Sequence, residues 1–140
     1  MTTADLPLIV LDTNIVSYFY KQHPLAEVYA PHLQSHRAVM SFQSLGELRY
    51  GMAVARWGNR RRADLEAFAA QFPTIYPNDI VCTLWAELRT AARTSGKQID
   101  IADAWVAATA LALRCPLVTH NDTDFSGIPG LNLMTENLQP

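Results

Sequence analysis

Four acidic residues that lie far apart in the chain, Asp12, Glu47, Asp103 and Asp124, each accompany an apolar segment. Carboxylates that meet at one point repel each other unless a cation lies among them. Oxygen ligands without His or Cys suit Mg²⁺ or Mn²⁺ better than zinc. Because protein-bound Mg²⁺ keeps waters and contacts phosphate oxygens, the natural reaction of such a cluster is hydrolysis of a phosphate ester.

Strands that alternate with helices would bring these acids together. Short apolar runs predict strands at residues 8–11, 38–40, 74–76, 117–119 and 131–133. Apolar periodicity and capping residues predict helices near 15–19, 24–35, 44–55, 65–72, 78–94 and 101–114. This order is typical of an α/β fold: three layers, with a central parallel sheet of four to five strands and helices on both faces. Residues 1–140 are expected to form a single domain.

The predicted topology places all four acids at one edge of the sheet. In a parallel sheet, the carboxyl ends of the strands and the first turns of the connecting helices lie at the same edge. Asp12 ends the first strand, and Asp124 follows the strand at 117–119. Glu47 and Asp103 are expected in the first turns of their helices. Open α/β folds bind ligands at this edge.

Each acid also has a structural explanation. Ser44 and Glu47 match a capping box, and Asp12 could cap the helix that follows it. Asp103 could complement the positive end of its helix.

Two neighbouring acids keep alternatives open. Asp100 could be the N-cap of the Asp103 helix or face the same pocket. Asp122 could replace Asp124 as the fourth acid, and either could stabilise the turn at 120–124.

The helix that carries Asp103 favours a metal. Residues 102–113 are apolar nearly all round, which is typical of an interior helix. A carboxylate there loses solvation worth several kcal/mol unless a partner compensates, and no Lys or Arg lies within one turn. A cation shared with the other acids would supply the missing charge.

The overall charge gives no sign of a polyanionic partner. Eleven Lys and Arg against thirteen Asp and Glu leave a net charge of −2, so RNA binding would need a local basic patch. The densest basic stretch is Arg60, Arg61 and Arg62, although i,i+4 pairs with Asp64 and Glu66 would explain two of them. Arg89, Arg93 and Lys97 form the next group. His120 lies beside the predicted site and could contact substrate.

The N-terminus has no basic region followed by a long apolar stretch, so neither a signal peptide nor a membrane span is expected. Cys82 and Cys115 are far apart and have no metal-ligand partners nearby, which favours reduced thiols. A soluble, cytoplasmic protein is the expectation.

Four motifs together resemble a known family. They are Val10-Leu11-Asp12-Thr13-Asn14, Ser44-Leu45-Gly46-Glu47-Leu48-x-Tyr50-Gly51, Asp103-x-x-Val106-Ala107-Ala108-Thr109-Ala110 and Val118-Thr119-x-Asn121-x-x-Asp124-Phe125. In this order and spacing they resemble the successive motifs of PIN-domain ribonucleases, specifically VapC-type toxins of bacterial toxin–antitoxin pairs.

The resemblance implies a Mg²⁺- or Mn²⁺-dependent endoribonuclease. Asp12 and Asp103 would be the principal metal ligands, and Glu47 and Asp124 would complete the pocket directly or through water. Thr13, Thr119 and Asn121 correspond to supporting polar residues. The family also implies a homodimer and an antitoxin protein that covers the pocket.

Two other classes of function fit parts of the pattern. One is a Mg²⁺-dependent phosphotransfer or phosphatase-type domain, for which Asn14 stands where an acid is wanted. The other is a non-catalytic binding module with the same fold. A covalent acyl-phosphate would identify the first, and full activity after loss of Asp103 would identify the second.

Overall fold

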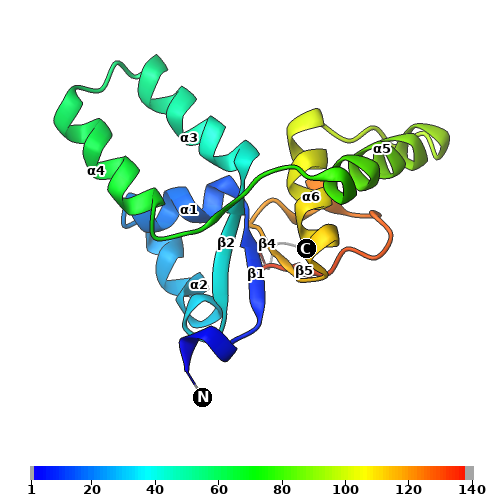
Figure 1. The fold of residues 1–140 in the computed structure, drawn as a ribbon, viewed down its shortest axis with the longest axis horizontal. Coiled ribbons are helices and arrows are strands. Elements are labelled where there is room, and N and C mark those ends of the chain that lie inside the picture. Colours follow the sequence, from blue (N-terminus) through cyan, green and yellow to red (C-terminus); the bar gives the residue numbers. More distant parts are fainter. Residues whose placement is uncertain (1, 138–140) are drawn as a thin grey trace.

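The computed structural model describes residues 2–137, within which five strands and six α-helices alternate (Figure 1). The strands are β1 (Leu8–Leu11), β2 (Arg37–Ser41), β3 (Thr74–Ile75), β4 (Leu117–Val118) and β5 (Leu133–Met134). The helices are α1 (Thr13–Tyr20), α2 (Pro24–Gln34), α3 (Phe42–Val54), α4 (Asn59–Ala69), α5 (Asp79–Thr94) and α6 (Ile101–Leu113). Two 3₁₀ turns, η1 (Thr3–Asp5) and η2 (Asp122–Phe125), complete these elements.

The strands form one parallel sheet in the order β3-β2-β1-β4-β5. The register pairs Val10 with Val39 on one side of β1 and with Leu117 on the other. The central strand is therefore covered along both edges. This confirms the predicted parallel sheet and its upper estimate of five strands.

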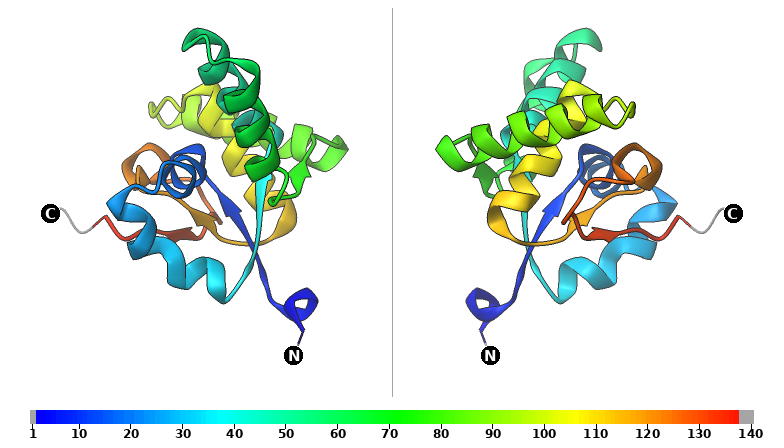
Figure 2. Two further views of the ribbon diagram at one scale, coloured as in Figure 1. Left: turned by 90° about the vertical axis from the view of Figure 1, so that its left-hand side faces the viewer. Right: turned by 90° about the vertical axis from the view of Figure 1, so that its right-hand side faces the viewer.

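The alternation of side chains along the strands divides the core between two helical layers. Val10, Val39 and Leu117 pack with α5 and α6, whereas Ile9, Leu11 and Met40 pack with α1, α2 and the end of α4. Views from the two sides show helices on both faces of the sheet (Figure 2). The predicted three-layer arrangement is confirmed.

Helices α3 and α4 extend beyond the sheet as an arm, with their connection at its outer end (Figure 1). The first residue of α3 follows β2 directly, because the side chain of Ser41 caps the helix by accepting a hydrogen bond from Gln43 N at 3.2 Å. The predicted N-cap, Ser44, lies three residues after the actual N-cap, Ser41. Glu47 consequently lies in the second turn of α3, and not in the first.

Within residues 2–137, none of the helices has both the length and the apolar character that crossing a lipid bilayer requires.

Candidate functional site

Asp12 is held in place by the end of β1 and the start of α1. It is the N-cap of α1, and its Oδ1 accepts a hydrogen bond from Thr13 N at 2.8 Å. Its Oδ2 accepts one from Thr119 Oγ1, also at 2.8 Å. The side chain is buried, and burial raises its pKa, while these two hydrogen bonds lower it and the charges of Glu47 and Asp124 raise it further. Asp12 therefore caps α1 through Oδ1, which confirms the capping role considered for it.

Hydroxyl groups link Asp12 to the segment after β4, and its neighbour Thr13 to helix α3. Thr119 follows β4 and is fully buried, and its Oγ1 also accepts a hydrogen bond from Asn121 N at 3.0 Å. Thr13 Oγ1 donates to Oγ of the buried Ser44 at 2.8 Å. Sequence reasoning did not assign Ser44 to the site, because its spacing from Glu47 suggested a capping box. Asn121 contributes its backbone N–H to this network.

Asp103 lies in the first turn of α6, as predicted. The helix N-cap is Asp100, whose Oδ1 accepts a hydrogen bond from Ala102 N at 2.9 Å. Partial burial and the charges of Asp12, Asp124, Asp100 and Glu47 raise the pKa of Asp103 to about 7. Asp100 is therefore the N-cap of α6, and Asp103 does not serve as a cap.

The electrostatic effects identify the acids that face one another. Asp12, Glu47 and Asp124 all raise the pKa of Asp103, and Glu47 and Asp124 raise that of Asp12. Asp122 acts on neither and instead accepts a hydrogen bond from Asn137 Nδ2 at 3.2 Å. Of the two acids in this turn, Asp124, which is exposed in η2, is therefore the one whose charge acts on Asp12 and Asp103, and the charge of Asp100 also acts on Asp103.

The acids act on one another electrostatically but do not form a closed ligand set. Among residues 2–137, no group of three Asp, Glu, His or Cys side chains is arranged to hold a metal ion jointly. This arrangement fits Mg²⁺ or Mn²⁺, because such ions keep several waters and need only one or two direct carboxylate ligands. Both amide atoms of Asn14, two residues beyond Asp12, are buried without a hydrogen-bond partner in the part of the chain described. A buried amide of this kind is normally satisfied by water or a ligand.

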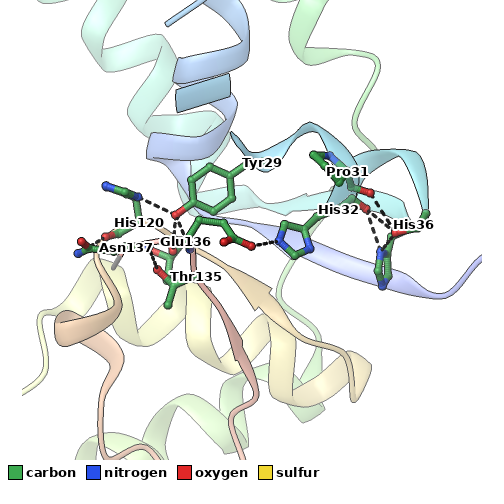
Figure 3. Close-up of polar contacts among 10 residues, drawn as sticks. Tyr29, Pro31, His32, His36, His120, Thr135, Glu136 and Asn137 are labelled. Atoms are coloured by element: carbon green, nitrogen blue, oxygen red, sulfur yellow. Dashed lines mark hydrogen bonds and ion pairs between the residues drawn. The ribbon is translucent and has the colours of Figure 1, made fainter. Parts of the chain in front are cut away.

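The C-terminal segment, Tyr29 and His120 contact one another (Figure 3). The buried Tyr29 hydroxyl accepts a hydrogen bond from Glu136 N at 3.0 Å and lies 2.6 Å from His120 Nδ1. The Tyr29 hydroxyl also donates a hydrogen bond to Thr119 O at 3.4 Å, so it contacts both the segment after β4 and the C-terminal segment. His32 Nε2 contacts Glu136 Oε1 at 2.9 Å and fastens the same segment to α2.

Arg60, Arg61 and Arg62 begin α4, at the outer end of the α3–α4 arm (Figure 1). The guanidinium of Arg61 lies 3.8 Å from the centre of the Trp57 ring, and Arg62 Nε donates to the Trp57 carbonyl at 2.8 Å. Glu66 pairs with Arg49 at 3.0 Å in place of the expected Arg62. None of these contacts connects the stretch with the acids.

Comparison with known proteins identifies the family to which the chain belongs. The family model described as PIN domain matches residues 9–131. Ribonuclease VapC1 of Haemophilus influenzae is 31% identical over 126 residues, which are 89% of this chain and 94% of that protein. The chain belongs to the VapC branch of the PIN domain family. VapC ribonuclease Y4jK of Sinorhizobium fredii is 33% identical and covers 91% of this PIN domain and 96% of its own length.

Solved structures agree with the family assignment. VapBC2 from Rickettsia felis, bound to a DNA fragment from its promoter, matches with a TM-score of 0.81 and 28% identity over 91% of this PIN domain and 98% of that chain. VapBC-1 from nontypeable Haemophilus influenzae matches with a TM-score of 0.78 and 28% identity, over 91% and 97% of the two chains.

Replacing Thr119 with Val is expected to lower the activity of this PIN domain about 10- to 100-fold, because outer hydrogen bonds of this kind orient the ligand carboxylate. Thr109→Val is the matched control, since Thr109 is equally buried but donates to Trp105 O inside α6 at 2.8 Å. Cleavage rates of both variants, measured with thermal unfolding, test the role of Thr119. Equal losses of activity in the two variants would show that Thr119 has only a packing role.

Proposed function

We propose that this PIN domain is a Mg²⁺- or Mn²⁺-dependent endoribonuclease and the toxin of a toxin–antitoxin pair. The observation that carries the proposal is the convergence of Asp12, Glu47 and Asp124 on Asp103. Partial burial, together with the charges of these acids and of Asp100, raises the pKa of Asp103 to about 7. Carboxylates in this arrangement attract a divalent ion, since the ion removes their mutual repulsion. The names of the VapC ribonucleases to which the chain is related support RNA as the substrate.

In this proposal Asp12 and Asp103 are the direct ligands of the ion. Thr119 and Thr13 N–H orient the two oxygens of Asp12, so the ligand is positioned before metal binds. Glu47 and Asp124 complete the pocket directly or through water. When bound, the ion would lower the pKa of a water ligand and offset negative charge on the phosphate. In this proposal His120 contacts the RNA substrate.

The partners follow from the same comparisons. Several similar structures are VapBC assemblies, which supports a cognate antitoxin for this chain. A homodimer is supported by large apolar side chains that are exposed one turn apart on α3, at Tyr50 (72%) and Val54 (64%). We propose a cytoplasmic location, where both RNA and a reduced state of Cys82 and Cys115 would be found.

A cleavage assay on the purified protein tests the proposal. A 5′-labelled RNA pool is expected to be cut in Mg²⁺ or Mn²⁺, to remain intact in EDTA, and to be cut again when metal is restored. Sequencing the 5′ ends of the fragments gives the cleavage position. Cleavage that persists in EDTA would contradict the metal-dependent mechanism, and an intact pool under all conditions would favour a non-catalytic binding module.

A further inference from the structure

Two hollows lie side by side along α5, and one of them reaches the acidic pocket. The first, of about 440 Å³, is lined by Asp124 and Lys97. The second, of about 520 Å³, is lined by Trp85, Arg89 and Arg93. Gln98 and Ile99, in the connection between α5 and α6, line both hollows. The hollows therefore adjoin at the connection between α5 and α6 and lie on neighbouring sides of α5.

Three cations lie around these two hollows. Arg89 and Arg93 are four residues apart, so they fall on one side of α5, about 6 Å from one to the next along its axis. Lys97 follows the end of the helix, where Gly96 has a φ of +76° and Lys97 N donates to Ala92 O at 2.9 Å. We call these three residues the basic stripe.

Lys97 connects the basic stripe to the acidic pocket. A β-carbon built on Gly127 would lie 3.0 Å from Lys97 Nζ, so the ammonium group rests against the backbone just after η2. Gly127 has a φ of +84°, which places it in the left-handed region that favours glycine. Asp124 lies three residues earlier in the same segment, within the hollow that Lys97 lines.

The cations of the basic stripe are available to a ligand. Within residues 2–137, none of the three forms an ion pair, whereas Arg49 is paired with Glu66. Arg89 lies 4.9 Å above the Trp85 ring, and Trp85 stacks on Trp105 with ring centres 4.6 Å apart. This stack orients the guanidinium plane of Arg89 in advance, which lowers the entropy cost of binding.

We infer that the basic stripe binds the backbone of a single-stranded RNA segment on one side of the phosphate that is cleaved. The inference rests on the proposed function, because it takes the acidic pocket as the place of cleavage. Several unpaired cations around adjoining hollows suit the phosphates of one strand, and the planar Arg89 group suits a base as well. An acidic protein segment is the competing occupant, but the hollow lined by Lys97 also contains Asp124, one of the carboxylates that a metal ion would make attractive to a phosphate.

Matched charge variants test the inference. One variant carries Arg89→Gln, Arg93→Gln and Lys97→Gln, and the control carries Arg60→Gln, Arg61→Gln and Arg62→Gln at the outer end of the arm. Each removes three positive charges, so a general electrostatic effect changes both equally. Affinity for a fluorescein-labelled, mixed-sequence, single-stranded RNA is measured in EDTA over a range of salt concentrations. Thermal unfolding monitors folding, and Lys97→Gln alone replaces the triple variant if that variant unfolds.

The stripe variant is expected to bind RNA at least about 30-fold more weakly, and its slope of log K against log salt should fall by about 2. The arm control should stay within about twofold of wild type. Equal weakening of the two variants overturns the inference. So does a stripe variant that keeps its RNA affinity but loses affinity for a labelled Glu-rich peptide, because the occupant would then be a protein.

Cleavage by the wild-type protein in Mg²⁺ separates this inference from the proposed function. If RNA binding depends on the stripe but wild type does not cut RNA, the proposed function fails and the stripe stands. If wild type cuts RNA and the stripe variant binds and cuts it equally well, the stripe fails and the proposed function stands.

Discussion

Replacing Asp103 with Asn is expected to reduce metal-dependent RNA cleavage about a thousandfold or more while the protein stays folded. The substitution keeps the size of the side chain but removes a charge on which the proposed metal depends. It also removes a carboxylate whose pKa is raised to about 7 by partial burial and by the repulsion of neighbouring acids. The metal-free variant should therefore be more stable than wild type at pH 8, by about 1 kcal/mol after allowance for solvent screening. Single-turnover cleavage and thermal unfolding measure the two effects.

Asp100→Asn is the matched control for this prediction. It is the same substitution three residues earlier in the chain, and Asn caps a helix as well as Asp, so α6 should keep its N-cap. Its cleavage rate should stay within a few-fold of wild type. Comparable losses in the two variants would mean that cleavage depends on the total negative charge near the start of α6 and not on Asp103 in particular. Full activity of Asp103→Asn would contradict the proposed mechanism and favour a binding module.

Most of the fold could be predicted because local pattern and tertiary structure agree. Helix α5 begins at Asp79, and Asn78 caps it by accepting a hydrogen bond from Val81 N at 2.9 Å. Helix α6 ends before Arg114, which adopts a left-handed conformation at φ +52°. The short last strand was less predictable. It lies at Leu133–Met134 and not at 131–133, because its register is set by pairing with Leu117 and Val118.

The approximate positions of the acids were predictable, whereas their local roles depended on contacts between distant segments. Ser41 and Ser44 are both plausible N-caps of α3. Ser41 caps the helix, whereas Ser44 accepts a hydrogen bond from Thr13 Oγ1. Asp122 and Asp124 have similar local sequences, but only the folded chain brings Asn137 to Asp122.

The basic residues show the same limit of sequence reasoning. The densest run, Arg60 to Arg62, lies at the far end of an arm, and the sparser stripe from Arg89 to Lys97 borders the acidic pocket. Density along the chain therefore did not indicate proximity to the site.

The metal-free protein is expected to lose stability as the pH rises. Metal binding is expected to restore that stability. The ordinary pKa of an Asp is 3.8, and in the folded protein that of Asp103 is about 7, while that of Asp12 is also raised. Between these values the folded state binds more protons than the unfolded chain, so its stability falls as pH rises from about 4 to about 7. With allowance for screening, the loss is about 1–2 kcal/mol, or about 3–6 °C in Tm.

Mg²⁺ requires deprotonated carboxylates, so it should raise Tm more at pH 8 than at pH 5. At a concentration 100 times its Kd, the increase at pH 8 would be about 9 °C. The difference between wild type and Asp103→Asn isolates the contribution of Asp103. Thermal unfolding of both proteins from pH 4 to 8, in EDTA and in Mg²⁺, makes the comparison. If Asp103→Asn kept the wild-type pH dependence and the wild-type response to Mg²⁺, the repulsion at Asp103 would not be what the ion relieves.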